Sequence, residues 1–377
     1  MSAGVRVALF FAALFAASAI YTAFLPLWFA DRGLDAVAIG QVLGAAALLR
    51  VFAGPGWGTV ADRVGRKPVM LAAAMTATVA ALLYIPSHGF LPLLLVAAVQ
   101  GVASSALNPL IDSLALALAR DGRMDYGKVR SIGSIAYMAA SAGPGWLLSI
   151  TGSWLVPWLL AASYGAGAIV TPLLPATAGK PGARRSLAGL HLFANRPFRL
   201  AVFASALIQG AHAAYYGFAP LFWRAHGLSD GMIGVLIAEG IVAEVALFAW
   251  GRRLIERLGP AGLTACAATA SLVRWSAMAW APPLPLLAVI QLLHAATFAM
   301  QHLSAMLVLS RSVPPERAAT AQALHAALGY GAPGGLLVLL AGFLYARFGG
   351  LAFLAMAVIG GAALLLVRPL RVSIRAS

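Results

Sequence analysis

The sequence predicts an all-α membrane protein with twelve transmembrane helices arranged in two six-helix bundles. Hydrophobic residues make up 62% of the 377 residues and charged residues only 10%, with a mean hydropathy of +0.89. Soluble domains carry about a quarter charged residues. Because a spanning helix needs about 20 apolar residues, a chain of this length has room for about a dozen spans and little else.

Glycine, proline and charge clusters divide the apolar sequence into segments of spanning length. The expected spans, in chain order, are residues 7–29, 36–60, 68–87, 90–118, 129–150, 154–175, 199–225, 230–251, 261–280, 284–310, 319–346 and 351–367. The first is longer than the apolar core of a signal peptide, so we interpret it as a retained span.

A polar interruption at 177–199 separates the first six spans from the last six. It carries the basic residues Lys180, Arg184, Arg185 and Arg196 and ends at Arg199. We therefore expect an N-terminal six-helix bundle at 1–176, a cytoplasmic linker at 177–198 and a C-terminal six-helix bundle at 199–377.

Basic residues predict the orientation, because cytoplasmic loops retain Lys and Arg. With both termini inside, only Arg32, Arg224 and Arg347 fall in outer loops. We expect an integral membrane protein of the bacterial inner (plasma) membrane, with both termini cytoplasmic.

Composition and motifs also exclude several classes of function. The net charge is +15, but the basic residues lie in short loops and not on one face, so nucleic acid is not an expected partner. The single cysteine, Cys266, excludes an intrachain disulfide framework and a Cys-rich metal site. Metal-ligand spacing, a nucleophile elbow and a phosphate loop are not found, so we expect no enzyme, no metal and no cofactor.

The loop at 58–67 carries the most specific motif, G-T-V-A-D-R-V-G-R-K. Glycine permits close helix approach, an acid can pair across the cytoplasmic side of the bundle, and basic residues keep the loop inside. A positive-inside loop alone would explain the basic residues but not the spacing of Gly58, Asp62 and Gly65. The pattern resembles the signature of the major facilitator superfamily, which implies a conformational gating loop formed by Gly58, Asp62, Arg63, Gly65, Arg66 and Lys67.

A degenerate echo of this motif occurs at 251–259, half a chain later, with Glu256-Arg257-Leu258-Gly259. Internal duplication is typical of transporters of this superfamily.

Ionisable residues inside the expected spans are the main candidates for function. Each costs about 2.5–3.5 kcal/mol on insertion scales, so such residues usually face the bundle interior and mark substrate or proton pathways. They are Arg50, Asp112, His212, Glu239, Glu244, Arg274, His294, His302 and His325. His212, His302 and His325 have an alternative interpretation as hydrogen-bonded packing residues.

Hairpin geometry predicts which of these residues share a depth. Residues equidistant from a turn lie at the same level, and the midpoint of Asp112 and Arg130 falls in the turn at residue 121. Arg274 and His294 are equidistant from the proline-rich turn at 282–285, about 15 Å deep at about 1.5 Å per residue. Glu239 reaches a similar depth. We expect an Asp112–Arg130 pair and a convergence of Glu239, Arg274 and His294.

The whole chain resembles the lactose permease branch of the superfamily and the related phenylpropionate permeases. Asp112 and Arg130 match the acid and arginine that grip substrate, and Tyr137 takes the place of a substrate-stacking Trp. Glu239, with a two-residue gap, matches a substrate-linked glutamate. Arg274 and His294 match an arginine and a histidine of the proton site.

The sequence also departs from that pattern. Thr297 stands where the permease has a proton-carrying Glu, and His212, Tyr215 and Tyr330 replace a set of paired charges. The segments around His302 and His325 are more similar to the phenylpropionate permeases. The resemblance implies a substrate site of Asp112, Arg130, Tyr137, Arg50, Tyr21, His212 and Tyr215, and a proton-coupling site of Glu239, Arg274, His294 and Glu244.

We therefore expect a monomeric secondary transporter that takes up an aromatic or other organic acid with a proton by alternating access. Its expected partners are a small-molecule substrate, the proton and membrane lipid. Protonation of Glu239 or Asp112 would lower the cost of moving that carboxyl through the low-dielectric interior. The alternatives are a proton symporter of a sugar or nucleoside, an exporter of drugs or metabolites, and a non-transporting receptor or assembly factor.

Overall fold

The computed structural model describes residues 1–175 and 187–376, which contain helices and no strand. Lys180, Arg184 and Arg185 of the expected linker lie outside the described residues. The chain divides into two compact units, Met1–Arg184 with Gly227–Ala238 and Arg185–His226 with Glu239–Ser377. One boundary between the units, between Ala238 and Glu239, falls within a helix.

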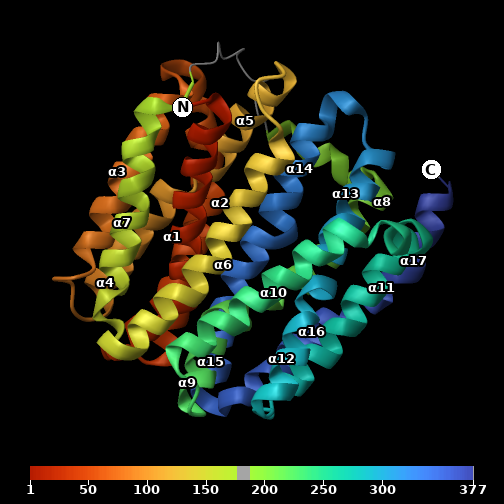
Figure 1. The fold of residues 1–377 in the computed structure, drawn as a ribbon. Helices are drawn as coiled ribbons and strands as arrows, with labels where there is room; N and C mark the ends of the chain where they lie inside the picture. Colours follow the sequence, from red (N-terminus) through yellow and green to blue (C-terminus); the bar gives the residue numbers. More distant parts are fainter. Residues whose placement is uncertain (176–186, 377) are drawn as a thin grey trace. The chain divides into compact units, whose positions relative to one another are not determined.

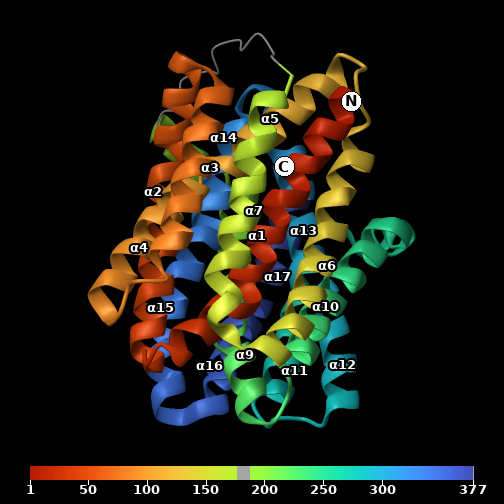
Figure 2. The same ribbon diagram turned by 60° about the vertical axis from the view of Figure 1, so that its left-hand side comes forward.

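The first unit is built around its N-terminal helix. Its elements are α1 (Ala3–Asp31), α2 (Ala36–Val64), α3 (Arg66–Leu83), α4 (Phe90–Ser104), α5 (Leu107–Arg120), α6 (Tyr126–Thr151), η1 (Ser153–Leu155), α7 (Val156–Val170) and η2 (Thr171–Leu173). Helix α1 packs along α6 and α7, and α3 packs against α7 and α4 (Figures 1 and 2).

Local sequence signals explain where several of these helices begin. Ser2, Asp35 and Asp125 are N-cap residues whose side chains accept hydrogen bonds from the backbone N–H of Val5, Ala38 and Lys128. Such caps satisfy amide groups that the first turn leaves without a partner.

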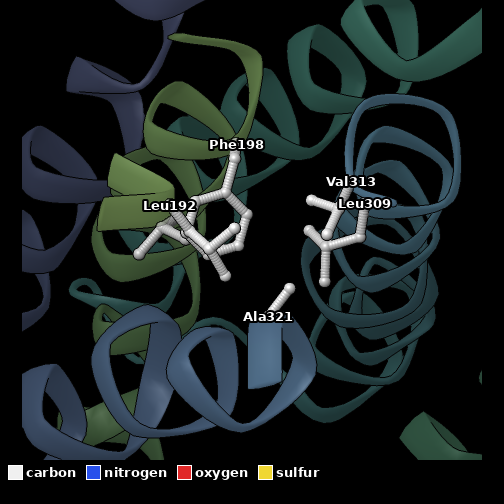
Figure 3. Close-up of a cluster of buried hydrophobic side chains, with 6 residues drawn as sticks. Leu192, Phe198, Leu309, Val313 and Ala321 are labelled. Carbon is white, nitrogen blue, oxygen red and sulfur yellow. The ribbon is translucent and has the colours of Figure 1, made fainter. Parts of the chain in front are cut away.

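The second unit contains most of the irregular helical segments. Its elements are η3 (Leu187–Ala194), α8 (Arg196–Gly210), α9 (His212–Ala225), α10 (Asp230–Trp250, in which the division falls), α11 (Arg252–Met278), α12 (Leu284–Leu292), the π-helix η4 (Ala295–Met300), α13 (Gln301–Ser312), η5 (Pro315–Arg317), α14 (Ala318–Ala326), the π-helix η6 (Ala327–Gly331), α15 (Ala332–Phe348), η7 (Gly349–Leu351), α16 (Ala352–Ala362) and α17 (Leu364–Ala376). One hydrophobic cluster joins η3, α8, α13 and α14 through residues such as Phe198, Leu309 and Ala321 (Figure 3).

Several expected spans are interrupted in the structure. The span predicted at 90–118 is α4 followed by α5, and the one at 199–225 is α8 followed by α9. The spans at 284–310 and 319–346 each contain a π-helical turn. Such turns carry one extra residue per turn, a feature that apolar periodicity does not reveal, and they are frequent at functional sites.

Eight helical stretches of the described residues are long and apolar enough to cross a membrane. They are Ala3–Asp31, Ala36–Val64, Arg66–Leu83, Phe90–Arg120, Ser153–Leu173, Asp230–Trp250, Leu284–Ser312 and Pro315–Arg375, and the last, with 61 residues, is long enough for two crossings. The figure of twelve spans therefore stays a prediction.

Candidate functional site

The motif at 58–67 spans the junction between α2 and α3. Asp62 and Arg63 lie in the last turn of α2, and Arg66 and Lys67 lie in the first turn of α3. Gly65 joins the helices with a φ of 95°, a left-handed conformation that side chains disfavour. Lys67 Nζ donates a hydrogen bond to the carbonyl oxygen of Pro172 at 2.9 Å, which ties the loop to η2, the segment that follows α7.

Asp112 and Arg130 form an ion pair in the first unit, as their equal depth predicts. Arg130 Nε on α6 lies 3.8 Å from Asp112 Oδ1 on α5, and the two side chains are 33% and 36% exposed. The Tyr126 hydroxyl donates to the same carboxylate oxygen at 3.1 Å. Both charges therefore keep access to a ligand.

Two phenylalanines of α1 complete this site. The Arg130 guanidinium carbon lies 4.2 Å from the centre of the Phe15 ring and 5.4 Å from that of Phe11. Tyr137 lies two turns beyond Arg130 on α6, so the two residues share a helix face. Sequence reasoning missed Phe11 and Phe15, because they sit in an apolar run without any polar neighbour.

Arg50 and Tyr21 form a second contact between α1 and α2. The Arg50 guanidinium carbon lies 5.8 Å from the centre of the Tyr21 ring. Arg50 therefore contacts an aromatic ring of α1.

Arg274 is the centre of a polar cluster in the second unit. Its side chain is fully buried. Its Nη1 donates to His294 Nδ1 at 3.1 Å and to Thr297 Oγ1 at 3.0 Å, and its Nη2 donates to Gln291 Oε1 at 3.0 Å. The rings of Tyr215 and Trp275 lie 4.6 and 4.5 Å from its guanidinium carbon. All of these partners are neutral groups.

The hydrogen bonds fix the protonation of one histidine in this cluster. Because Arg274 is always a donor, His294 Nδ1 accepts and carries no proton, so this imidazole is neutral. His212 Nδ1 faces the Ile208 carbonyl oxygen at 3.0 Å, so it donates, and its Nε2 lies 3.1 Å from Thr297 Oγ1, a hydroxyl that can donate or accept. Thr297 thus links His212 and Arg274.

The structure separates the two acids of α10. His294 Nε2 lies 3.7 Å from Glu244 Oε2, and the Glu244 side chain is 18% exposed. Glu239 forms no hydrogen bond or ion pair with the described residues. Five positions on a helix are about 140° apart, so the two acids point in different directions. The expected convergence with Arg274 and His294 therefore involves Glu244.

A second buried polar group lies one helix turn beyond the first. Ser205 Oγ contacts His325 Nε2 at 2.9 Å and accepts from Gln301 Nε2 at 3.0 Å. The His302 and Tyr330 rings lie 6.5 and 5.9 Å from the His325 ring. These contacts agree with the packing interpretation of His325. In the described part of the chain, no three metal-ligating side chains gather.

Comparisons with known proteins find similar sequences and structures among membrane transporters. A profile described as the MFS_1 like family matches residues 5–355. A probable 3-phenylpropionic acid transporter of Escherichia coli K12 is 31% identical over 90% of each chain. A maltose permease of Geobacillus stearothermophilus is 30% identical over 84% of this chain and 81% of that one. The crystal structure of the nucleoside transporter NupG superposes with a TM-score of 0.85 over 99% of both chains, at 17% identity.

Proposed function

Because the chain belongs to the MFS_1-like family of the major facilitator superfamily, we propose that it imports an aromatic or other organic acid together with a proton. The protein is an integral membrane transporter and not an enzyme, and transporters of this superfamily carry small-molecule substrates. The direction of transport, its coupling to a proton and the class of acid transported are the parts that we propose.

The proposed architecture has twelve spans in two bundles, residues 1–176 and 199–377, joined by a cytoplasmic linker at 177–198. Both termini face the cytoplasm of a bacterial inner membrane, and the protein acts as a monomer. Transport follows alternating access, in which one half of such a transporter rocks against the other around a fixed site.

The observation that carries the proposal is the environment of Arg130. A guanidinium offers a planar fork of donors that fits a carboxylate, and here it lies over the rings of Phe15 and Phe11. An aromatic acid presents both a carboxylate and a ring. The named specificity of the Escherichia coli relative supports the same class of substrate.

Uptake by purified protein in liposomes tests this proposal. An inward proton gradient is expected to drive accumulation of labelled 3-phenylpropionate above its external concentration, and a protonophore is expected to abolish it. Accumulation of maltose or uridine in place of the acid would favour the sugar or nucleoside alternative, which the maltose permease relative supports. Export driven by the opposite gradient would overturn the importer assignment.

A further inference from the structure

The environment of Arg274 contains a positive charge without an adjacent counter-ion. The guanidinium stays protonated in proteins, and a buried charge is expensive unless an opposite charge offsets it. Its hydrogen-bond acceptors are an imidazole, a hydroxyl and an amide oxygen. In the described part of the chain, its Nε has no hydrogen-bond partner. The charge must be offset from farther away.

His294 connects this charge to an acid. Its Nδ1 accepts from Arg274, so the ring proton lies on Nε2, and that nitrogen faces the Glu244 carboxylate at 3.7 Å. The neutral imidazole is therefore polarised from both sides, by the cation at one nitrogen and by the anion at the other. Gly240 allows this approach of α10, because a Cβ there would lie only 3.2 Å from His294 Cβ.

We infer that Glu244 is the carboxyl group that binds and releases the transported proton, and that its charge offsets Arg274 through His294. This inference rests on the proposed function. When Glu244 is ionised, the cluster is balanced. When Glu244 takes up a proton, the charge of Arg274 is no longer offset, so protonation changes the electrostatic balance of the second unit.

Other titratable groups near the cluster do not replace Glu244 in this role. His212 on α9 is hydrogen-bonded to the Ile208 carbonyl oxygen and to Thr297, and Tyr215 on α9 covers the guanidinium with its ring. Glu239 on α10 makes no hydrogen bond or ion pair with the cluster in the described part of the chain, although its charge acts on Tyr215. Glu244 is the acid that both contacts the cluster and keeps partial exposure for proton exchange.

The first test needs no substrate. Infrared difference spectra of the purified protein, recorded across a pH titration, report the carbonyl stretch of protonated carboxyl groups. Glu244→Gln is expected to remove one component of this band, and Glu239→Gln is expected to leave that component in place. Loss of the component in Glu239→Gln but not in Glu244→Gln would overturn the inference.

The second test measures coupling in liposomes with 3-phenylpropionate. Glu244→Gln is expected to lose accumulation driven by the proton gradient while retaining part of the counterflow exchange, and Glu244→Asp, which keeps a titratable group, is expected to recover accumulation. Glu316→Gln, an exposed acid in η5, should still accumulate and serves as the control. Accumulation by Glu244→Gln would refute the assignment.

The two tests separate this inference from the proposed function. If the wild-type protein shows the infrared component assigned to Glu244 but does not accumulate 3-phenylpropionate, the substrate proposal fails and the proton site stands. If accumulation occurs and Glu244→Gln leaves both accumulation and the infrared band unchanged, the proton site fails and the transporter proposal stands. Thermal unfolding of each variant confirms that it is folded.

Discussion

At the residue scale, Thr297 shows how one hydroxyl holds a buried network together. It accepts from Arg274 and contacts His212 Nε2, and it is fully buried. Thr297→Ala would leave the facing groups of Arg274 and His212 without this partner, at a cost of about 1–3 kcal/mol each. We expect a lower thermal unfolding midpoint in detergent for Thr297→Ala.

The conservative variant separates the hydroxyl from packing. Thr297→Ser removes only a methyl group and keeps the two hydrogen bonds, so its unfolding midpoint should lie closer to that of the wild type. Equal losses in the two variants would show that the methyl group, and not the network, is responsible.

Arg130 gives a residue-scale prediction for binding. Lys keeps the charge but lacks the planar fork and the flat face that lies 4.2 Å from the Phe15 ring centre. Arg130→Lys is therefore expected to weaken binding of 3-phenylpropionate about tenfold, or about 1.4 kcal/mol, by isothermal titration calorimetry. Arg123→Lys, an exposed loop change, is the control. Unchanged affinity in Arg130→Lys would remove Arg130 from the substrate site.

At the element scale, α16 packs closely on α11 because α16 carries Gly360. A Cβ at Gly360 would lie 2.7 Å from Ser271 Cβ, one turn before Arg274 on α11. Since membrane helices associate largely through close packing of small residues, Gly360→Ala should push the two helices apart and lower the unfolding midpoint. Gly334 on α15 has no atom within 4 Å of the corresponding Cβ, so Gly334→Ala should not. Similar midpoints in both variants would contradict this packing argument.

The same helices show which parts of the site the sequence could predict. Distance from a turn gives the depth of a residue, and the structure confirms the pairs Asp112–Arg130 and Arg274–His294. Depth does not give rotation about the helix axis. The choice of Glu244 over Glu239 as the partner of His294 depends on rotation, and so does the contact of Thr297 with Arg274. Thr297 lies inside the π-helix η4. The spacing of apolar residues in the sequence does not reveal that this turn is π-helical.

At the scale of the whole molecule, the family and the all-helical architecture followed from composition and one motif, because lipid admits few architectures. The number of spans is less determined. Helices α6 and α11 are long enough for a span but are not among the eight apolar stretches of the described residues. Both carry charges in the spanning region, Arg130 and Arg274, whose partners lie inside their own units. A partner inside the same unit lowers the cost of placing a charged residue in a span. The mean apolarity of a segment does not reflect such a partner.

Cysteine labelling decides whether α6 and the α8–α9 segment cross the bilayer. In a Cys266→Ser background, single cysteines at Trp154 and Ala225 are expected to react with a membrane-impermeant maleimide on intact cells. Those at Arg123 and Ser310 should react only after permeabilisation, because twelve spans place these positions on opposite sides. All four are exposed in the structure. If α6 did not cross, Trp154 would be labelled on the same side as Arg123, and the division into two six-helix bundles would be wrong.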